Sequence, residues 1–324
     1  MENIKLLYPF SNSQYQSFMQ GLADELVESG IPVVAPKSIP MGIRLMVAKL
    51  EISRCFQYFS RGKNLIVLCG GYPDYAAFPF AYTNNIIPII WDSWPKYWDR
   101  ILDSFKRHNV KLAFFTQSQS AKYIHENLPQ VECVYIPEGL NSTGYKKGKK
   151  LKDRNIDVLE LGRLYEPVHC KLEKIALTLN ISHQFIKDVT QKRLFDTFED
   201  LAEGLADSKI VINYPRCITH PEMAGEVETL TQRYWECMYS RCLMLGHAPN
   251  ELISLIGYNP VIECEINNIQ DQVLHILNNI DSYQKMVDEN YEAAMNFGSW
   301  KSRLSTIYEK LGIRLTDNDY RIIE

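Results

Sequence analysis

Residues 157–164, Asp-Val-Leu-Glu-Leu-Gly-Arg-Leu, decide the fold that the sequence predicts. Residues 157–161 form a short strand-like segment, which stops at Gly162, and Arg163 follows directly. A glycine at the end of a strand lets a ligand approach the backbone, and a guanidinium beside it can form paired hydrogen bonds with a phosphate. A plain glycine turn followed by a solvated arginine would give the same pattern.

The rest of the second half continues this strand with alternating helices and strands. Helical spacing is present around 171–180, 195–206, 231–240 and 250–256, and strand patterns are present at 209–213, 243–245 and 261–263. From residue 269 onward the apolar residues follow helical spacing only. This half therefore predicts one sheet of strands separated by helices.

The first half shows the same alternation. Strand patterns occur at 4–8, 32–35, 65–69, 86–90, 111–115 and 133–136, with helical patterns between most of them. Strands that alternate with helices predict a parallel sheet covered on both faces. The predicted fold class is α/β, with two Rossmann-like doubly wound domains that face a cleft, and ligands are expected beyond the carboxyl ends of the strands.

The length of 324 residues agrees with two domains. We place the boundary in a lysine-rich run bracketed by glycines, which is typical of a linker. The predicted domains are 1–148, 149–298 and a returning C-terminal helix at 299–324. The basic run consists of Lys146, Lys147, Lys149, Lys150, Lys152 and Arg154.

Composition excludes several classes of protein. Hydrophobic residues make up 46% and charged residues 23%, which is ordinary globular composition and excludes disorder, collagen and coiled coil. The longest apolar runs fall far short of the roughly 20 residues that span a bilayer. The start of the chain lacks the features of a secretion signal, so we expect a cytoplasmic protein.

Cofactor fingerprints are missing as well. The eight cysteines include no C-x-x-C pair, so we expect reduced core cysteines and no zinc motif. Neither G-x-G-x-x-G nor the P-loop pattern occurs, which argues against dehydrogenases and kinases.

A second feature is the segment 228–236, Glu-Thr-Leu-Thr-Gln-Arg-Tyr-Trp-Glu, which surrounds the predicted start of a helix. The free N–H groups and the dipole of a helix N-terminus suit a diphosphate, and Arg233 would add positive charge. Glu236 could accept hydrogen bonds from ribose hydroxyls. Alternatively, Glu228 and Glu236 only compensate the helix dipole.

Taken together, these two segments resemble the carboxyl-terminal domain of GT-B glycosyltransferases, in particular the group 1 class with an E-x7-E motif. The resemblance implies that Gly162 and Arg163 hold the diphosphate of a nucleotide sugar. It implies that Glu228 contacts the donor sugar and that Glu236 binds the ribose. Residues 299–303 are similar to the start of the family's last helix, which crosses back to the N-terminal domain.

The sequence departs from the family pattern at three places. Residues 229–231 replace a glycine-rich turn, and Arg241 stands where the family has a glycine before the last strand. The family's phosphate lysine would fall on Val168, so Lys171 or Arg233 would supply a second cation. His220, which precedes the E-x7-E segment, could reach the donor or be merely solvated.

The acceptor is expected on the N-terminal domain, at side chains that follow its strands. Asp92 is the best-placed carboxylate and could act as general base, although Asp92 or Ser93 could instead cap the helix that begins near Pro95. The tryptophan rings could stack on sugars or belong to the core. The predicted acceptor residues are Ser11, Asn12, Tyr72, Asp74, Trp91 and Trp94.

The resemblance implies a glycosyltransferase, a hexosyltransferase by class, that moves a sugar from a nucleotide-diphosphate sugar to a hydroxyl of a sugar or glycolipid. Retention of configuration and a role in surface polysaccharide or glycolipid assembly are further expectations. No cofactor is expected, and no metal either, because the D-x-D match at 317–319 lies in a polar tail.

Other interpretations stay open. A non-catalytic nucleotide- or sugar-binding relative, or a nucleotide-sugar epimerase of the same fold, would fit the same motifs. The run 146–154 could contact an anionic membrane or be a solvated hinge. No nucleic-acid partner is expected.

Overall fold

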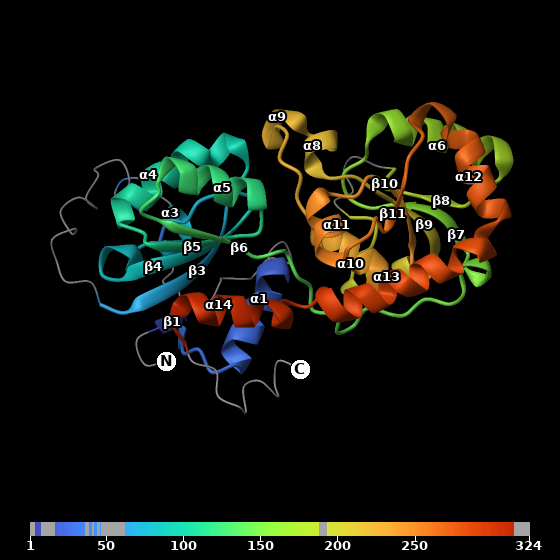
Figure 1. Ribbon diagram of the computed structural model, residues 1–324. Coiled ribbons are helices and arrows are strands. Elements are labelled where there is room, and N and C mark those ends of the chain that lie inside the picture. The colour runs from blue at the N-terminus through green and yellow to red at the C-terminus, as the bar shows by residue number, and fades with distance from the viewer. Residues whose placement is uncertain are drawn as a thin grey trace. The chain divides into compact units, whose positions relative to one another are not determined.

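The structure is a computed structural model that describes residues 4–7, 17–35, 39–40, 42–43, 46, 62–187 and 193–313. Two compact units divide the chain (Figure 1). Unit 1 comprises Met1–Glu138, Glu222–Val227 and Trp300–Glu324, and unit 2 comprises Gly139–Pro221 and Glu228–Ser299.

Unit 1 contains a parallel sheet of six strands in the order β2-β1-β3-β4-β5-β6. Its central strands are continuous apolar runs, as expected for strands that are covered on both faces. After Asn85 every residue of β4 is buried. The strands are β1 (Ile4–Leu7), β2 (Val33–Val34), β3 (Asn64–Gly70), β4 (Asn85–Trp91), β5 (Leu112–Phe115) and β6 (Glu132–Tyr135).

Helices cover both faces of this sheet (Figure 1). One face packs against α1 (Ser17–Glu28), η8 (Trp300–Arg303) and α14 (Leu304–Leu311). The other face packs against α3 (Asp74–Ala77), η3 (Phe80–Tyr82), η4 (Pro95–Tyr97), α4 (Trp98–His108) and α5 (Ser118–Asn127). The last described segment, from Trp300 onward, thus completes the core of unit 1.

Unit 2 contains a parallel sheet of five strands in the order β11-β10-β9-β7-β8. The strands are β7 (Ile156–Glu160), β8 (His183–Gln184), β9 (Ser208–Asn213), β10 (Leu243–Gly246) and β11 (Val261–Glu263). The sequence pattern missed β8, which has only two residues, both polar.

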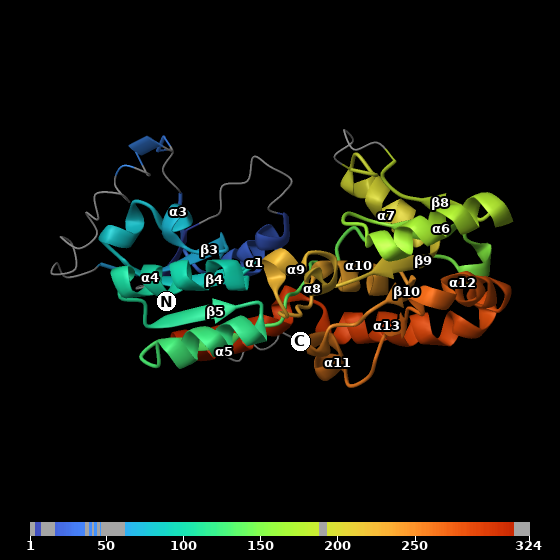
Figure 2. The same cartoon turned by 90° about the horizontal axis from the view of Figure 1, so that it is seen from above.

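The helices of unit 2 also form two layers, one on each face of its sheet (Figure 1), and Figure 2 shows the same elements turned by 90°. One layer contains η5 (Leu151–Asp153), α6 (Glu166–Leu179), η6 (Ile266–Asn268), α12 (Ile269–Asn278) and η7 (Ile280–Tyr283). The other contains α7 (Phe198–Ala206), α10 (Gln232–Tyr239), α11 (Asn250–Ile256) and α13 (Gln284–Phe297). The short helices α8 (Arg216–Thr219) and α9 (Pro221–Ala224) lie between β9 and α10 in the chain. The prediction of two doubly wound α/β domains is confirmed.

Strand order locates the place where each sheet can receive a ligand. In unit 2 the order reverses between β7 and β9, and in unit 1 it reverses between β1 and β3. Helices that follow neighbouring strands at such a switch point lie on opposite faces of the sheet, so a crevice opens beyond the carboxyl ends of those strands. The loop that carries Gly162 and Arg163 leaves β7 at the switch point of unit 2.

The lysines of the basic run are exposed, whereas Arg154 at its end is buried in unit 2. Arg154 is 3% exposed and donates hydrogen bonds to the carbonyl oxygens of Lys149, Ser208 and Ser240 at 3.0, 2.7 and 3.1 Å. Lys146 pairs with Glu203 at 2.6 Å. The chain already enters unit 2 at Gly139, ahead of the boundary predicted at residue 148.

In the described part of the chain, every helix is too short or too polar to cross a lipid bilayer.

The seven described cysteines are free thiols. Three of them, Cys69, Cys237 and Cys242, are buried, whereas Cys170 is exposed.

Candidate functional site

Four parallel strands of unit 2 end side by side at one edge of their sheet. The register aligns Glu160 with Ile212, and aligns Gly246 with both Asn213 and Glu263. The loops that follow these strands therefore leave the sheet at the same edge. In spatial order from β7 to β11, they begin with Leu161-Gly162-Arg163, Tyr214-Pro215, His247-Ala248 and Cys264-Glu265.

Two glycines shape this edge for different reasons. Gly162 has a φ of 77° with nothing within 4 Å of the position of a Cβ, so the left-handed backbone, not the space, requires glycine there. Gly246 has a φ of 150°, and a Cβ would meet the carbonyl oxygen of Asn213 at 1.9 Å. Glycine at 246 thus allows the end of β10 to lie against β9, and it sets the direction in which His247 leaves the sheet.

The turn at Gly162 leads into α6, whose N-terminus lies at this edge. Tyr165 is the N-cap residue of α6, and its ring lies 4.7 Å from the ring of Tyr214, which follows β9. Arg163 is exposed in the turn. A left-handed glycine, an exposed arginine and the positive end of a helix dipole therefore meet at the switch point.

Lys171, the predicted second cation, has another role in the structure. It lies on α6, and its Nζ donates a hydrogen bond to the carbonyl oxygen of Ile266 at 2.8 Å. This contact ties α6 to the segment after β11. Val168, which stands where the family has a phosphate lysine, is fully buried in the core.

Glu228 takes part in a charged cluster with a histidine that the sequence analysis missed. The Nε2 of His247 lies 3.1 Å from Glu228 Oε1, and its Nδ1 lies 3.0 Å from Glu263 Oε2. Asn250, the first residue of α11, donates from its backbone N–H and its Nδ2 to Glu228 Oε2 at 3.1 and 2.8 Å. Burial alone would lower the pKa of His247, but hydrogen bonds with Glu263 and Glu228 outweigh it and raise the pKa above its ordinary value.

Glu236 is held inside unit 2. It is 5% exposed; its Oε1 accepts a hydrogen bond from the Tyr145 hydroxyl at 2.9 Å, and its Oε2 pairs with Arg233 Nη1 at 2.5 Å. Burial and the neighbouring Glu236 charge raise the pKa of Tyr145, so this hydroxyl stays a donor. Arg233, with its side chain 31% exposed, is the member of this group nearer to solvent.

The other residues singled out in this half lie as follows. His220 ends α8 and is half-buried, and its Nδ1 is buried without a hydrogen-bond partner among the described residues. Arg241, where the family has a glycine, has a φ of 56°. Position 241 therefore has the left-handed backbone that favours glycine, although an arginine stands there. The arginine side chain donates a hydrogen bond to the carbonyl oxygen of Gly148 and pairs with Asp288.

The aromatic residues predicted for the acceptor are mostly inside unit 1. Trp91 and Trp94 are each 2% exposed, and the Trp91 ring packs edge to face on Trp300 with centroids 5.5 Å apart. Their faces are covered by protein, so stacking on a sugar is not supported. Ser11 and Asn12 lie outside the described residues.

Asp92 is exposed at the carboxyl end of β4, with a φ of 51°. The helix that begins at Pro95 has Trp94 as its N-cap residue, without a side-chain cap. Ser93 is buried and donates its hydroxyl to Gln117 Oε1. Neither Asp92 nor Ser93 is the N-cap residue of this helix.

Tyr72 and Asp74, which follow β3, are both partly buried. Asp74 pairs with Arg107 at 2.8 Å and lies 3.4 Å from His108 Nε2. Burial alone would raise the pKa of Asp74, but the hydrogen bond from His108 and the charge of Arg107 lower it. The guanidinium of Arg100 lies over the Tyr72 ring, with its Cζ 5.5 Å from the ring centroid.

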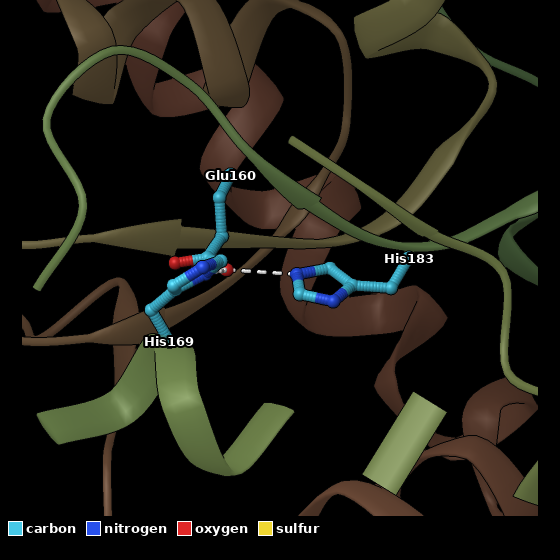
Figure 3. Close-up of side chains that lie close together, drawn as sticks. All are labelled: Glu160, His169 and His183. Carbon is cyan, nitrogen blue, oxygen red and sulfur yellow. Dashed lines mark hydrogen bonds and ion pairs between the residues drawn. The ribbon is translucent and has the colours of Figure 1, made fainter. Parts of the chain in front are cut away.

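A second charged cluster, which the sequence analysis also missed, includes Glu160, the last residue of β7, two positions before Gly162 in the chain (Figure 3). Glu160 Oε1 lies 2.8 Å from His169 Nδ1 and 2.7 Å from His183 Nε2. The side chains of Glu160 and His183 are 2% and 3% exposed, and that of His169 is 15% exposed. The three residues come from β7, α6 and β8, so no local spacing in the sequence could reveal them.

Comparison of the sequence with protein-family models and with curated proteins finds no match. The structure, in contrast, is similar to solved structures over nearly its whole length. Sucrose-phosphate synthase from Thermosynechococcus elongatus has 12% identity and a TM-score of 0.60, covering 95% of this chain and 98% of that one. HepE from Anabaena, in complex with UDP-glucose, has 11% identity and a TM-score of 0.58, covering 95% and 99%.

A third neighbour is AviGT4, a glycosyltransferase involved in avilamycin A biosynthesis, with 14% identity, a TM-score of 0.52, and coverage of 99% and 97%. At such identities the likeness shows the fold. The chain has the two parallel-sheet α/β domains of GT-B glycosyltransferases.

Proposed function

We propose that this protein is a glycosyltransferase that moves a sugar from a nucleotide-diphosphate sugar to a hydroxyl acceptor. The observation that carries the proposal is the position of the Gly162-Arg163 turn, at the switch point of the unit 2 sheet and at the N-terminus of α6. The fold supports it, because HepE, a neighbour over nearly the full chain, was solved in complex with UDP-glucose.

For the donor diphosphate we propose Arg163 and the N-terminus of α6 as ligands. Exposed Arg163 can form paired, charge-assisted hydrogen bonds with phosphate oxygens, and the helix dipole favours the negative charge. Arg233 is the better candidate for a second cation, because Lys171 already bonds to the backbone of Ile266. Glu236 then acts as a positioning residue for Arg233, since both carboxylate oxygens are engaged within the protein.

For the donor sugar we propose Glu228 as the ligand of a hydroxyl group. His247 and Asn250 fix the orientation of its carboxylate, which is 24% exposed. A protonated His247 offsets one of the two negative charges of Glu228 and Glu263, so the cluster repels the donor phosphates less strongly than two free carboxylates would.

For catalysis we propose Asp92 as the general base that accepts the acceptor's proton. It is an exposed carboxylate at the carboxyl edge of the unit 1 sheet, where ligands of such sheets bind. Retention of configuration, transfer of a hexose, and a sugar or glycolipid acceptor in surface polysaccharide assembly are proposals that rest on the family resemblance alone.

The test is calorimetry with UDP, GDP, ADP and CMP, followed by incubation of the matching nucleotide sugars with a panel of hydroxyl acceptors. A transferase binds one nucleotide selectively and releases it only when a glycosylated product forms. Tight binding without turnover would identify a non-catalytic relative, and release of nucleotide with an altered free sugar, without an acceptor, would identify an epimerase. Absence of binding to all four nucleotides would contradict the proposal.

A further inference from the structure

The strongest unexplained feature of unit 2 is the carboxylate of Glu160. It is buried at the last position of β7, and among the described side chains its only ion-pair partners are His169 and His183. An ionised carboxylate is costly to bury unless positive charge accompanies it. Neutral imidazoles donate hydrogen bonds but bring no charge, and a bound cation would supply the positive charge that the buried carboxylate needs.

The ring of Phe185 closes the cluster on one side. Its centroid lies 4.6 Å from that of His169 and 4.7 Å from that of His183. This apolar wall shields one side of the cluster from solvent, which strengthens the attraction between the carboxylate and any cation placed beside it. The three donor atoms, Glu160 Oε1, His169 Nδ1 and His183 Nε2, all lie within 4.8 Å of one another.

We propose that Glu160, His169 and His183 bind a divalent metal ion, with zinc as the ion that suits them best. Two imidazoles and one carboxylate are a ligand set that zinc accepts, with a water as fourth ligand, whereas magnesium and calcium prefer oxygen ligands. Zinc distances of about 2.0–2.2 Å place neighbouring tetrahedral ligands roughly 3.3 Å apart, so the two contacts with Glu160 must open by about half an ångström.

The remaining ring nitrogens of the two histidines lie differently. A zinc ion on Nε2 of His183 places the ring proton on Nδ1, which is buried and has no hydrogen-bond partner among the described residues. The other ring N–H of a metal-bound histidine is normally bonded to protein or water, so we expect a water molecule there. His169, the most exposed of the three, can bond to solvent through its Nε2.

The location gives the ion a structural role. Glu160 ends β7, His169 lies in the first turns of α6, and the five residues 161–165 between these elements contain Gly162 and Arg163. His183 begins β8, the neighbour of β7. A zinc ion would thus join β7, β8 and α6 and fix the base of the turn that presents Arg163. Metal binding itself does not depend on the proposed glycosyl transfer.

The test is a zinc titration of the full chain after chelation and dialysis, with metal content measured by mass spectrometry and binding by competition with a chromophoric chelator. One zinc per chain and a higher unfolding temperature with zinc are expected. His169→Gln and His183→Gln should each weaken binding at least about a hundredfold, since even outer-shell partners are worth ten- to a hundredfold. Glutamine can still donate a hydrogen bond to Glu160, which preserves the fold.

Two matched controls separate this cluster from adventitious zinc binding. His275→Gln removes an exposed imidazole from α12, and Cys170→Ser removes the exposed thiol next to His169. Neither change should alter the affinity. Less than one zinc per wild-type chain would overturn the proposal without any variant, and so would equal affinity of the wild type and the folded His169→Gln protein.

Discussion

Both sheets are parallel, and loops follow the carboxyl ends of their strands, but the side chains at these two edges differ. At this edge of unit 1, Trp91, Trp94 and the bond from Ser93 to Gln117 are buried, and Asp92 is exposed. In unit 2 the corresponding edge carries ionisable groups in two clusters, centred on Glu160 and on His247. The parallel topology alone therefore does not determine what either edge can bind.

This difference indicates a division of roles. Unit 2 presents Arg163 at a helix N-terminus, an arrangement of positive charge that suits an anionic ligand. Unit 1 presents Asp92 as an exposed carboxylate beside a closed aromatic core. Variants in unit 2 should change nucleotide affinity, and variants in unit 1 should change turnover or stability.

The largest effect is expected for Asp92→Asn, which removes the carboxylate that we propose as general base. Turnover should fall about 10²- to 10⁴-fold, with little change in nucleotide affinity. Asparagine tolerates the left-handed backbone of this position, where φ is 51°, so the loop should persist. Steady-state kinetics against Asp103→Asn, an exposed carboxylate on α4, is the measurement. Normal turnover in Asp92→Asn would leave unit 1 without a catalytic role.

Trp300→Ala should destabilise unit 1 by about 3–5 kcal/mol, because it empties a fully buried position against Trp91. The free energy of unfolding can be measured with urea, and Met295→Ala, half-exposed on α13, serves as control with a change within about 0.5 kcal/mol. A loss as small as that of the control would show that the chain from Trp300 onward does not complete the core of unit 1.

Arg233→Ala and Glu236→Ala should each weaken nucleotide binding about tenfold, the effect of losing one charge-assisted contact of roughly 1.5 kcal/mol. If Glu236 acts through Arg233, the double variant should bind no more weakly than either single one. Additive losses, measured by calorimetry, would instead assign Glu236 a contact of its own, such as the ribose expected from the family resemblance.

The smallest effect is a pH dependence of stability at His247. Its folded-state pKa is raised above the unfolded value of about 6.5 by Glu263 and Glu228. The stabilisation is therefore complete below about pH 6.5 and is lost as the pH rises through the raised pKa. His247→Gln should flatten the profile of unfolding free energy between pH 6 and 9, while His275→Gln should leave it unchanged. If the unfolding free energies of the wild type and His247→Gln changed in parallel with pH, the contribution of a charged His247 to stability would be contradicted.

Strands were predictable from the sequence because buried parallel strands are continuous apolar runs, as in β3 and β4. The pattern failed at β8, which consists of His183 and Gln184, and at the start of α6, where Glu166 and Pro167 precede the first apolar position. It also failed at Arg154, because a basic residue in a lysine-rich run gives no sign that it is buried against three carbonyl groups.

The candidate site was predictable only where its residues are neighbours in the chain. Gly162 and Arg163 form a local motif, and the structure places them at the switch point. The contacts of Glu160 with His183 and of His247 with Glu263 join different strands, so they depend on the register of the sheet. Side-chain burial, which removed Trp91 from the candidates, likewise depends on packing that spacing does not show.

The central claim is that unit 2 holds the nucleotide through the Gly162-Arg163 turn, and calorimetry on Arg163→Ala tests it most directly. We predict that the wild type binds one equivalent of its preferred nucleotide among UDP, GDP, ADP and CMP. Arg163→Ala should bind it about ten- to a hundredfold more weakly, corresponding to roughly 1.5–3 kcal/mol. Lys174→Ala, which removes an exposed charge further along α6, should bind like the wild type. Wild-type affinity in Arg163→Ala would contradict the account.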